Sequence, residues 1–287
     1  MKLTILGGDE RSIKLANLLM EDDYDIKAFG FEENYIDKSI LCSTLEKALK
    51  DSDIIIGPIP LTRDKIFLNT PFYSTNIKLK DIFNNMKSTQ ILIAGSIPEL
   101  IYNIGEFHNI KVIDLMEREE MSVLNGIPTA EGAIQIAMEN MDIVLHGANA
   151  LVLGFGRMGK ILAKKLKGLD ANVYVAARKI ADVSWIEAYG YIPVNLSELN
   201  DYIGNMDVIF NTIPTMILDE DKLQHVDRDS LIIDIASAPG GVDFEKAKEL
   251  NIKTVWALGL PGKVAPKTAA MIIKNTIKNI IAELGGE

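Results

Sequence analysis

Cysteine is almost absent from the sequence, and the histidines form no metal-binding pattern. Cys42 is the only cysteine, which excludes an internal disulfide and a cysteine-based metal cluster and favours a reducing compartment. His108, His146 and His225 do not stand at the spacing of HxxxH or HExxH motifs, so they predict no metal site. No GxSxG motif is present, which disfavours a serine hydrolase. We therefore expect neither a bound metal nor hydrolase chemistry.

Basic clusters and long apolar runs are also missing. The net charge is −10 at pH 7, and an acidic chain without a basic block predicts no nucleic-acid partner and no binding to a membrane surface. No apolar stretch reaches the roughly 18 residues of a membrane span. The apolar run at the start of the chain is too short for a secretory signal. We expect a cytoplasmic protein.

What the sequence does contain is an alternation of short apolar runs, glycine or proline turns and amphipathic stretches. This alternation occurs twice and predicts βαβ units with parallel sheets. The first series of strands is expected at Leu3–Leu6, Asp25–Gly30, Asp53–Ile56, Gln90–Ala94 and Lys111–Asp114. The second series is expected at Asn149–Leu153, Asn172–Ala176, Tyr191–Val194, Asp207–Asn211, Leu231–Ile235 and Lys253–Ala257.

The two series predict an α/β protein with two Rossmann-like, doubly wound parallel-sheet lobes and a cleft between the lobes. Residues 1–140 are expected to form a substrate-binding, catalytic lobe that a C-terminal helix, 266–287, completes. Residues 141–265 are expected to form the dinucleotide-binding domain. Thr129 is a candidate N-cap for a helix that runs to about Met141. The long segment between Pro58 and Asp81 has weak periodicity, as functional loops often do.

The strongest motif is a GxGxxG sequence between a predicted strand and a predicted helix, the context that makes this motif informative. Gly154 permits the tight turn, Gly156 lets a pyrophosphate approach the backbone, and Gly159 allows the helix to pack closely on the strand. The helix N-terminus then offers free N–H groups to the anion. The predicted cofactor-binding residues of this motif are Gly154, Phe155, Gly156, Arg157, Met158 and Gly159.

The end of the next strand bears on which dinucleotide binds. An NAD site usually places an acidic residue there, about 20 residues after the motif, to bind the ribose 2′-OH. This sequence has Ala177, Arg178 and Lys179 instead, and two cations favour the 2′-phosphate of NADP. The alternative, that both side chains are merely solvated, stays open.

Another predicted strand end faces the same crevice of a doubly wound fold. Its residues complete the predicted cofactor set, although an ordinary turn explains them equally well: Asn211, Thr212, Ile213 and Pro214.

Three cations are candidates for binding an anionic substrate. Arg11 follows a glycine turn at the start of the first predicted helix, and Lys263 and Lys267 follow the last predicted strand in a loop rich in glycine and proline. Such groups would neutralise the carboxylates of a small dicarboxylate. Each is also explained by a solvated surface charge, and no acid–base residue is identified.

Several of these segments together resemble the family of dipicolinate synthase A subunits along nearly the whole chain. The segment from Phe31 to Asn84 resembles the family less. The matching segments are 5–11, 126–132, 153–159, 211–214, 234–241 and 259–269, of which the last two are the most specific.

The resemblance implies an NADP-dependent oxidoreductase acting on a CH–CH group in the cytoplasm of the mother cell of a sporulating bacterium. The implied reaction, a branch of the lysine pathway, oxidises dihydrodipicolinate, or its hydroxylated precursor, to dipicolinate. The smaller B subunit of dipicolinate synthase is the implied partner, and we also expect a homo-oligomer. Two other interpretations remain open from the residues: an NAD(P)-dependent 2-oxo, hydroxy or amino acid dehydrogenase, and a dinucleotide-sensing protein without catalysis.

Overall fold

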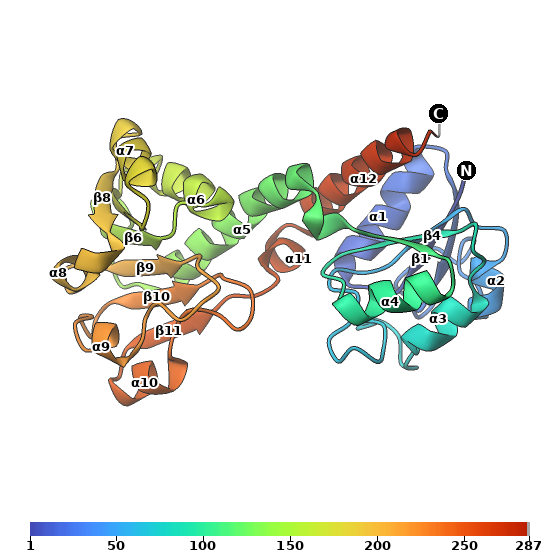
Figure 1. Cartoon of the computed structure of the whole chain (residues 1–287), viewed down its shortest axis with the longest axis horizontal. Coiled ribbons are helices and arrows are strands. Elements are labelled where there is room, and N and C mark those ends of the chain that lie inside the picture. Colours follow the sequence, from blue (N-terminus) through green and yellow to red (C-terminus); the bar gives the residue numbers. More distant parts are fainter. Residues whose placement is uncertain (286–287) are drawn as a thin grey trace. The chain divides into compact units, whose positions relative to one another are not determined.

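The computed structural model describes residues 1–285 and divides the chain into two α/β units, shown in Figure 1. Unit 1 contains Met1–Leu124 and the chain from Ala265 onward, and unit 2 contains Asn125–Val264. The domain boundary expected at 140/141 falls at the end of a helix, whereas the units divide inside that helix. The last two residues of the predicted closing segment, 286 and 287, lie outside the described residues.

The sheet of unit 1 has five parallel strands in the order β2-β1-β3-β4-β5. All five predicted strands are confirmed, with small shifts at their ends. The crossover in strand order lies between β1 and β3, the kind of position where doubly wound sheets bind ligands at their carboxyl edge. The strands are β1 (Lys2–Leu6), β2 (Asp25–Phe29), β3 (Ile54–Ile56), β4 (Ile91–Ala94) and β5 (Lys111–Asp114).

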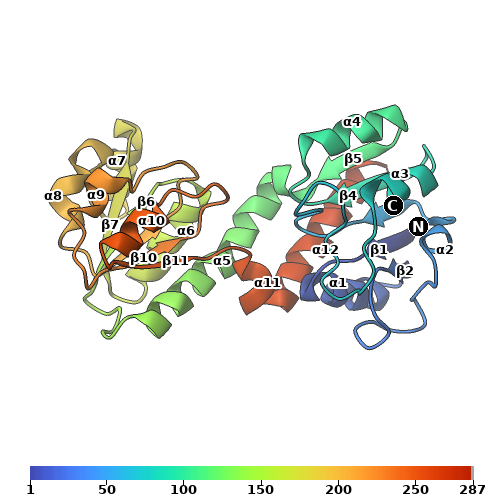
Figure 2. The same cartoon turned by 90° about the horizontal axis from the view of Figure 1, so that it is seen from below.

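Helices cover both faces of this sheet because successive strand residues point to opposite sides. Leu3 and Ile5 share a buried cluster with α1 and α12, which lie alongside each other (Figure 2). Leu6 instead shares a cluster with α2, α3 and α4. The helices are α1 (Glu10–Glu21), α2 (Leu45–Leu49), α3 (Leu79–Asn85), α4 (Glu99–Phe107) and α12 (Pro266–Glu283), with a 3-10 turn at Leu115–Glu117.

The sheet of unit 2 has six parallel strands in the order β11-β10-β9-β6-β7-β8. The chain reverses its direction of growth between β6 and β9, which is the arrangement of a dinucleotide-binding Rossmann fold. The predicted fold class is therefore confirmed in both units. The strands are β6 (Asn149–Leu153), β7 (Asn172–Ala177), β8 (Ile192–Asn195), β9 (Val208–Asn211), β10 (Leu231–Asp234) and β11 (Lys253–Trp256).

Two buried clusters flank this second sheet. One joins Ala150 and Val152 of β6 to α6 and to the later part of α5, and the other joins Leu151 and Leu153 to α8, α9 and α10. No helix among the described residues is both long and apolar enough to cross a membrane. The helices are α5 (Glu119–Asn140), α6 (Arg157–Lys167), α7 (Ile180–Ala188), α8 (Leu199–Ile203), α9 (Glu220–Leu223), α10 (Phe244–Glu249) and α11 (Leu260–Val264), with a 3-10 turn at Leu196–Glu198.

The prediction that Thr129 caps a helix is wrong, because α5 already begins at Glu119 and contains Pro128. The Thr129 hydroxyl donates a hydrogen bond back to the carbonyl of Asn125, 2.7 Å away, as a mid-helix threonine can. A proline inside a helix removes one backbone donor and leaves the carbonyl four residues earlier, here that of Leu124, without its helical partner. Burial of Met121, Ala130 and Ala133 on both sides of the proline outweighs that loss.

Candidate functional site

The glycine turn after β6 has a geometry that only glycine permits at two positions. Gly154 has a φ of +99°, a conformation that side chains disfavour. A Cβ on Gly159 would lie 2.0 Å from the carbonyl oxygen of Gly154, so any side chain there would push α6 away from β6. Both glycines therefore bring the start of α6 close to the carboxyl end of the strand.

Gly156 differs, because nothing in the protein requires its lack of a side chain. Its φ is −77°, and a Cβ built on it would meet no atom within 4 Å. Gly156 is the N-cap of α6, and no side chain caps the helix there. The exposed backbone, the free N–H groups and the positive end of the helix dipole fit a dinucleotide pyrophosphate.

The other residues of the motif fall around this turn. Phe155 is buried in the core of unit 2, and the Lys160 ammonium lies 5.1 Å from the centre of its ring. Arg157 opens α6 and is exposed, while Met158 is half-buried. Phe155 thus supports the turn from below.

The end of β7 carries cations and no acidic residue. Ala177 is buried as the last residue of the strand, and Arg178 and Lys179 follow it on the surface. Lys179 is the N-cap residue of α7. Neither side chain has an ion-pair or hydrogen-bond partner within residues 1–285, so both are available to an anionic ligand.

A buried polar pair organises the neighbouring strand ends. Asn211 ends β9 and Asp234 ends β10, and both are fully buried. The Asn211 amide nitrogen donates to Asp234 Oδ1 at 2.9 Å and to the carbonyl of Ile213 at 3.0 Å. Its oxygen accepts a hydrogen bond from the Ile213 backbone N–H at 3.0 Å. Asn211 therefore positions the turn, with its whole side chain engaged by protein groups.

The Asp234 carboxylate extends the same network to the next loop. It accepts hydrogen bonds from the backbone N–H groups of Ala236 at 2.9 Å and Gly241 at 2.8 Å. The motifs in the sequence assign no role to Asp234. Register could have revealed it, because Asn211 and Asp234 are directly paired positions at the ends of adjacent parallel strands.

The remaining predicted residues of this strand end differ in exposure. The Thr212 hydroxyl donates to the carbonyl of Leu153 at 2.8 Å, next to the glycine turn. Ile213 is half-buried and Pro214 is exposed. These two residues form the accessible part of the edge.

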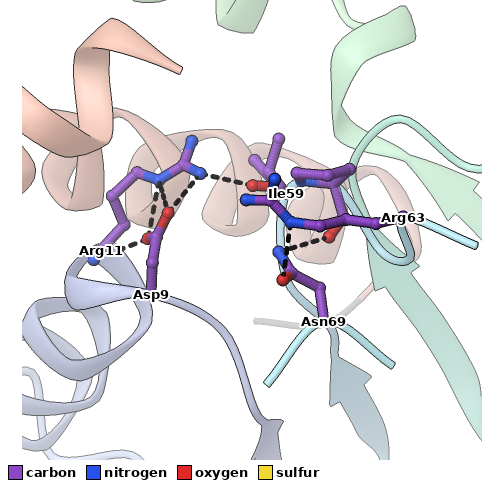
Figure 3. A network of polar contacts seen from close by, with 6 residues as sticks. Asp9, Arg11, Ile59, Arg63 and Asn69 are labelled. Atoms are coloured by element: carbon purple, nitrogen blue, oxygen red, sulfur yellow. Dashed lines mark hydrogen bonds and ion pairs between the residues drawn. The ribbon is translucent and has the colours of Figure 1, made fainter. Parts of the chain in front are cut away.

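In unit 1, Arg11 is a buried cation with fixed partners. Its side chain is 7% exposed, and its Nε and Nη2 atoms donate to the carboxylate of Asp9 at 2.9 Å and 2.7 Å. Nη2 also donates to the carbonyl of Ile59, in the loop after β3 (Figure 3). Asp9 also caps α1 by accepting from the backbone N–H of Arg11. Arg11 thus connects the β1 turn to the β3 loop.

The two candidate lysines fall in different units. Lys263 lies in α11 of unit 2, and Lys267 lies in the first turn of α12 in unit 1. Both are exposed, and in the described part of the chain neither has a carboxylate partner.

The comparisons with family models match both units. Residues 2–116 match the family described as the N-terminal domain of the dipicolinate synthase A subunit. Residues 135–258 match the shikimate/quinate 5-dehydrogenase family, whose match covers the glycine turn and the strand ends described above.

Individual relatives match over the full length. The dipicolinate synthase A subunit of Bacillus subtilis (strain 168) is 34% identical over 290 residues, which cover 100% of this chain and 98% of that protein. The crystal structure of the B. subtilis protein has a TM-score of 0.90 at 33% identity, covering 99% of this chain and 97% of that one. The corresponding structure from Bacillus halodurans has a TM-score of 0.90 at 31% identity, covering 98% and 97%.

The buried pair predicts a pH-dependent stability defect in Asn211→Asp. This change would place a second carboxyl group beside Asp234, and two carboxyl groups at that distance cannot both ionise. The folded variant must keep a proton, which raises the pKa of one carboxyl above its unfolded value. Folding then binds a proton, so the free energy of unfolding should fall as pH rises from about 5 to about 8, by up to about 1.4 kcal/mol per pH unit.

The measurement is urea unfolding of the variant and the wild type across this pH range. Asn211→Ala is the control, because it removes the amide hydrogen bonds without adding a titratable group. A penalty in Asn211→Asp that is as independent of pH as in Asn211→Ala would contradict the prediction.

Proposed function

The chain belongs to the family of dipicolinate synthase A subunits, and from this membership we propose that it is an NADP-dependent oxidoreductase that forms dipicolinate. The observation that carries the proposal is the open backbone at Gly156, at the start of α6, within a chain that matches this family over its full length. The match of unit 2 to a dehydrogenase family supports a nicotinamide dinucleotide as the cofactor.

The proposed reaction removes two electrons and two hydrogens from a ring CH–CH group. Dihydrodipicolinate and NADP⁺ give dipicolinate, NADPH and a proton; from the hydroxylated precursor, water must be lost as well. When bound, the nicotinamide supplies the hydride acceptor. The product ring is aromatic, which favours hydride loss, so the protein's contribution is to bind the carboxylates and orient the ring.

The chain offers cations for both ligands. Arg178 and Lys179 would bind the 2′-phosphate of NADP, because both are exposed and unpaired within the described residues. Lys263 and Lys267 are the proposed substrate-facing cations for the same reason. Arg11 would act by holding the β3 loop, since Asp9 and Ile59 occupy its Nε–Nη2 edge.

The proposal extends to a partner and a place of action. The B. subtilis relative is named as one lettered component of a synthase, the A subunit, and we propose that this chain likewise works with the B subunit of that enzyme. We further propose that it acts as a homo-oligomer in the cytoplasm of the mother cell of a sporulating bacterium, in a branch of the lysine pathway.

The test is a coupled assay with freshly formed dihydrodipicolinate and NADP⁺ that follows NADPH and dipicolinate together, in the presence and in the absence of the B subunit. Equimolar formation of both products is the expected result. NADP⁺ binding without product in either condition would contradict catalysis and favour a dinucleotide-sensing role. Turnover of pyruvate with NADH, without dipicolinate formation, would favour an acid dehydrogenase instead.

The proposed dinucleotide preference predicts a selective defect in Arg178→Ala/Lys179→Ala. Charge-assisted hydrogen bonds contribute enough that the Kd for NADP⁺ should rise about 10- to 100-fold, while the Kd for NAD⁺ changes less than about threefold. Titration calorimetry with both dinucleotides measures the two values. The control is Lys164→Ala/Lys167→Ala, which removes two positive charges from the end of α6 away from the turn. An equal loss of affinity for NADP⁺ and NAD⁺ in the double variant would contradict 2′-phosphate recognition.

A further inference from the structure

The segment from Gly57 to Lys78 in unit 1 is an ordered loop that covers the carboxyl edge of the sheet. The backbone N–H of Leu61 donates to the carbonyl of Gly95, which follows β4, at 2.8 Å. The N–H of Asn69 donates to the carbonyl of Leu61 at 2.9 Å. A Cβ on Gly7, which follows β1, would lie 3.3 Å from the carbonyl oxygen of Asn69. The loop is therefore fixed above the crossover between β1 and β3.

Arg63 extends from this loop with its side chain held at one end only. Its Nε atom donates to the Asn69 side-chain oxygen at 3.2 Å, and the Asn69 amide nitrogen donates to the carbonyl of Pro60 at 3.3 Å. Asn69 is only 9% exposed, so this anchor is rigid. Figure 3 shows the guanidinium group of Arg63 pointing toward Ile59, the residue whose carbonyl Arg11 binds.

The two terminal nitrogens of Arg63 have no partner among residues 1–285, and the nearby carboxylates are engaged elsewhere. Asp9 is paired with Arg11. Asp64 accepts from the backbone N–H groups of Phe67 and Ile66 at 2.8 Å each, and these bonds lower its pKa. Arg63 is thus an exposed, uncompensated cation in a chain of net charge −10.

An arginine held at Nε presents its two terminal nitrogens as a fork that matches a carboxylate. On the basis of the function proposed above, we propose that Arg63 is a specificity-determining residue that binds one carboxylate of the dicarboxylate substrate. Arg11 is a positioning residue for this contact, because it fixes the loop through Ile59. The second carboxylate is left to the lysines named above.

The test compares two stable probes, dipicolinate and pyridine-2-carboxylate, which differ by one carboxylate. Their Kd values are measured by calorimetry on the full chain in the presence of NADP⁺. Arg63→Gln should raise the Kd for dipicolinate about 10- to 100-fold and change that for pyridine-2-carboxylate less than about threefold. Arg63→Lys should fall between these values, because it keeps the charge but loses the fork.

Lys65→Asn is the matched control. It removes the same charge from the same loop, and asparagine tolerates the positive φ of +66° at that position. Both Kd values should stay within about threefold of the wild type in this variant. Melting curves establish that all variants are folded.

Two negative outcomes are distinguishable. If the wild type prefers dipicolinate and Arg63→Gln keeps that preference, the role of Arg63 is wrong while the proposed function stands. If the wild type binds neither probe and forms no dipicolinate in the coupled assay, both the proposed function and the role of Arg63 are overturned.

Discussion

The close approach of Gly159 to the carbonyl of Gly154 is the contact on which the dinucleotide site depends. Because no side chain separates them, α6 starts directly at the carboxyl end of β6. Its free N–H groups and the positive end of its dipole then lie at the crossover of the strand order, where a doubly wound sheet binds its ligand. The open space at Gly156 is a consequence of this packing and gives an anion access to the backbone.

The strand ends in both units share a second constraint, the neutralisation of buried carboxylates by backbone N–H groups. Asp234 at the end of β10 accepts from Ala236 and Gly241. Asp114 at the end of β5 accepts in the same way from Ser96, Ile97 and Met116. Buried carboxylates with such partners fix the loops that follow parallel strands. These loops can therefore carry functional groups without losing their shape.

Most of the architecture was predictable because its signals are local. Apolar runs ending in glycine or proline gave the strands within a residue or two, and the GxGxxG motif in its strand–helix context gave the turn at Gly154. What failed was Thr129 as an N-cap, because burial of α5 on both sides of Pro128 outweighs the local preference of proline to start or end a helix. The roles of Asp234, Asn69 and Arg63 depend on strand register and on a loop without periodicity, and neither can be read from residue spacing.

Gly156→Val tests most directly whether the open backbone at α6 is the dinucleotide site. The backbone conformation at Gly156 suits valine and its Cβ meets no protein atom, so the free energy of unfolding should fall by no more than about 1 kcal/mol from the poorer N-cap. Titration calorimetry should then show loss of measurable NADP⁺ binding in a folded protein. NADP⁺ affinity equal to that of the wild type would contradict the account, because it would place the pyrophosphate elsewhere.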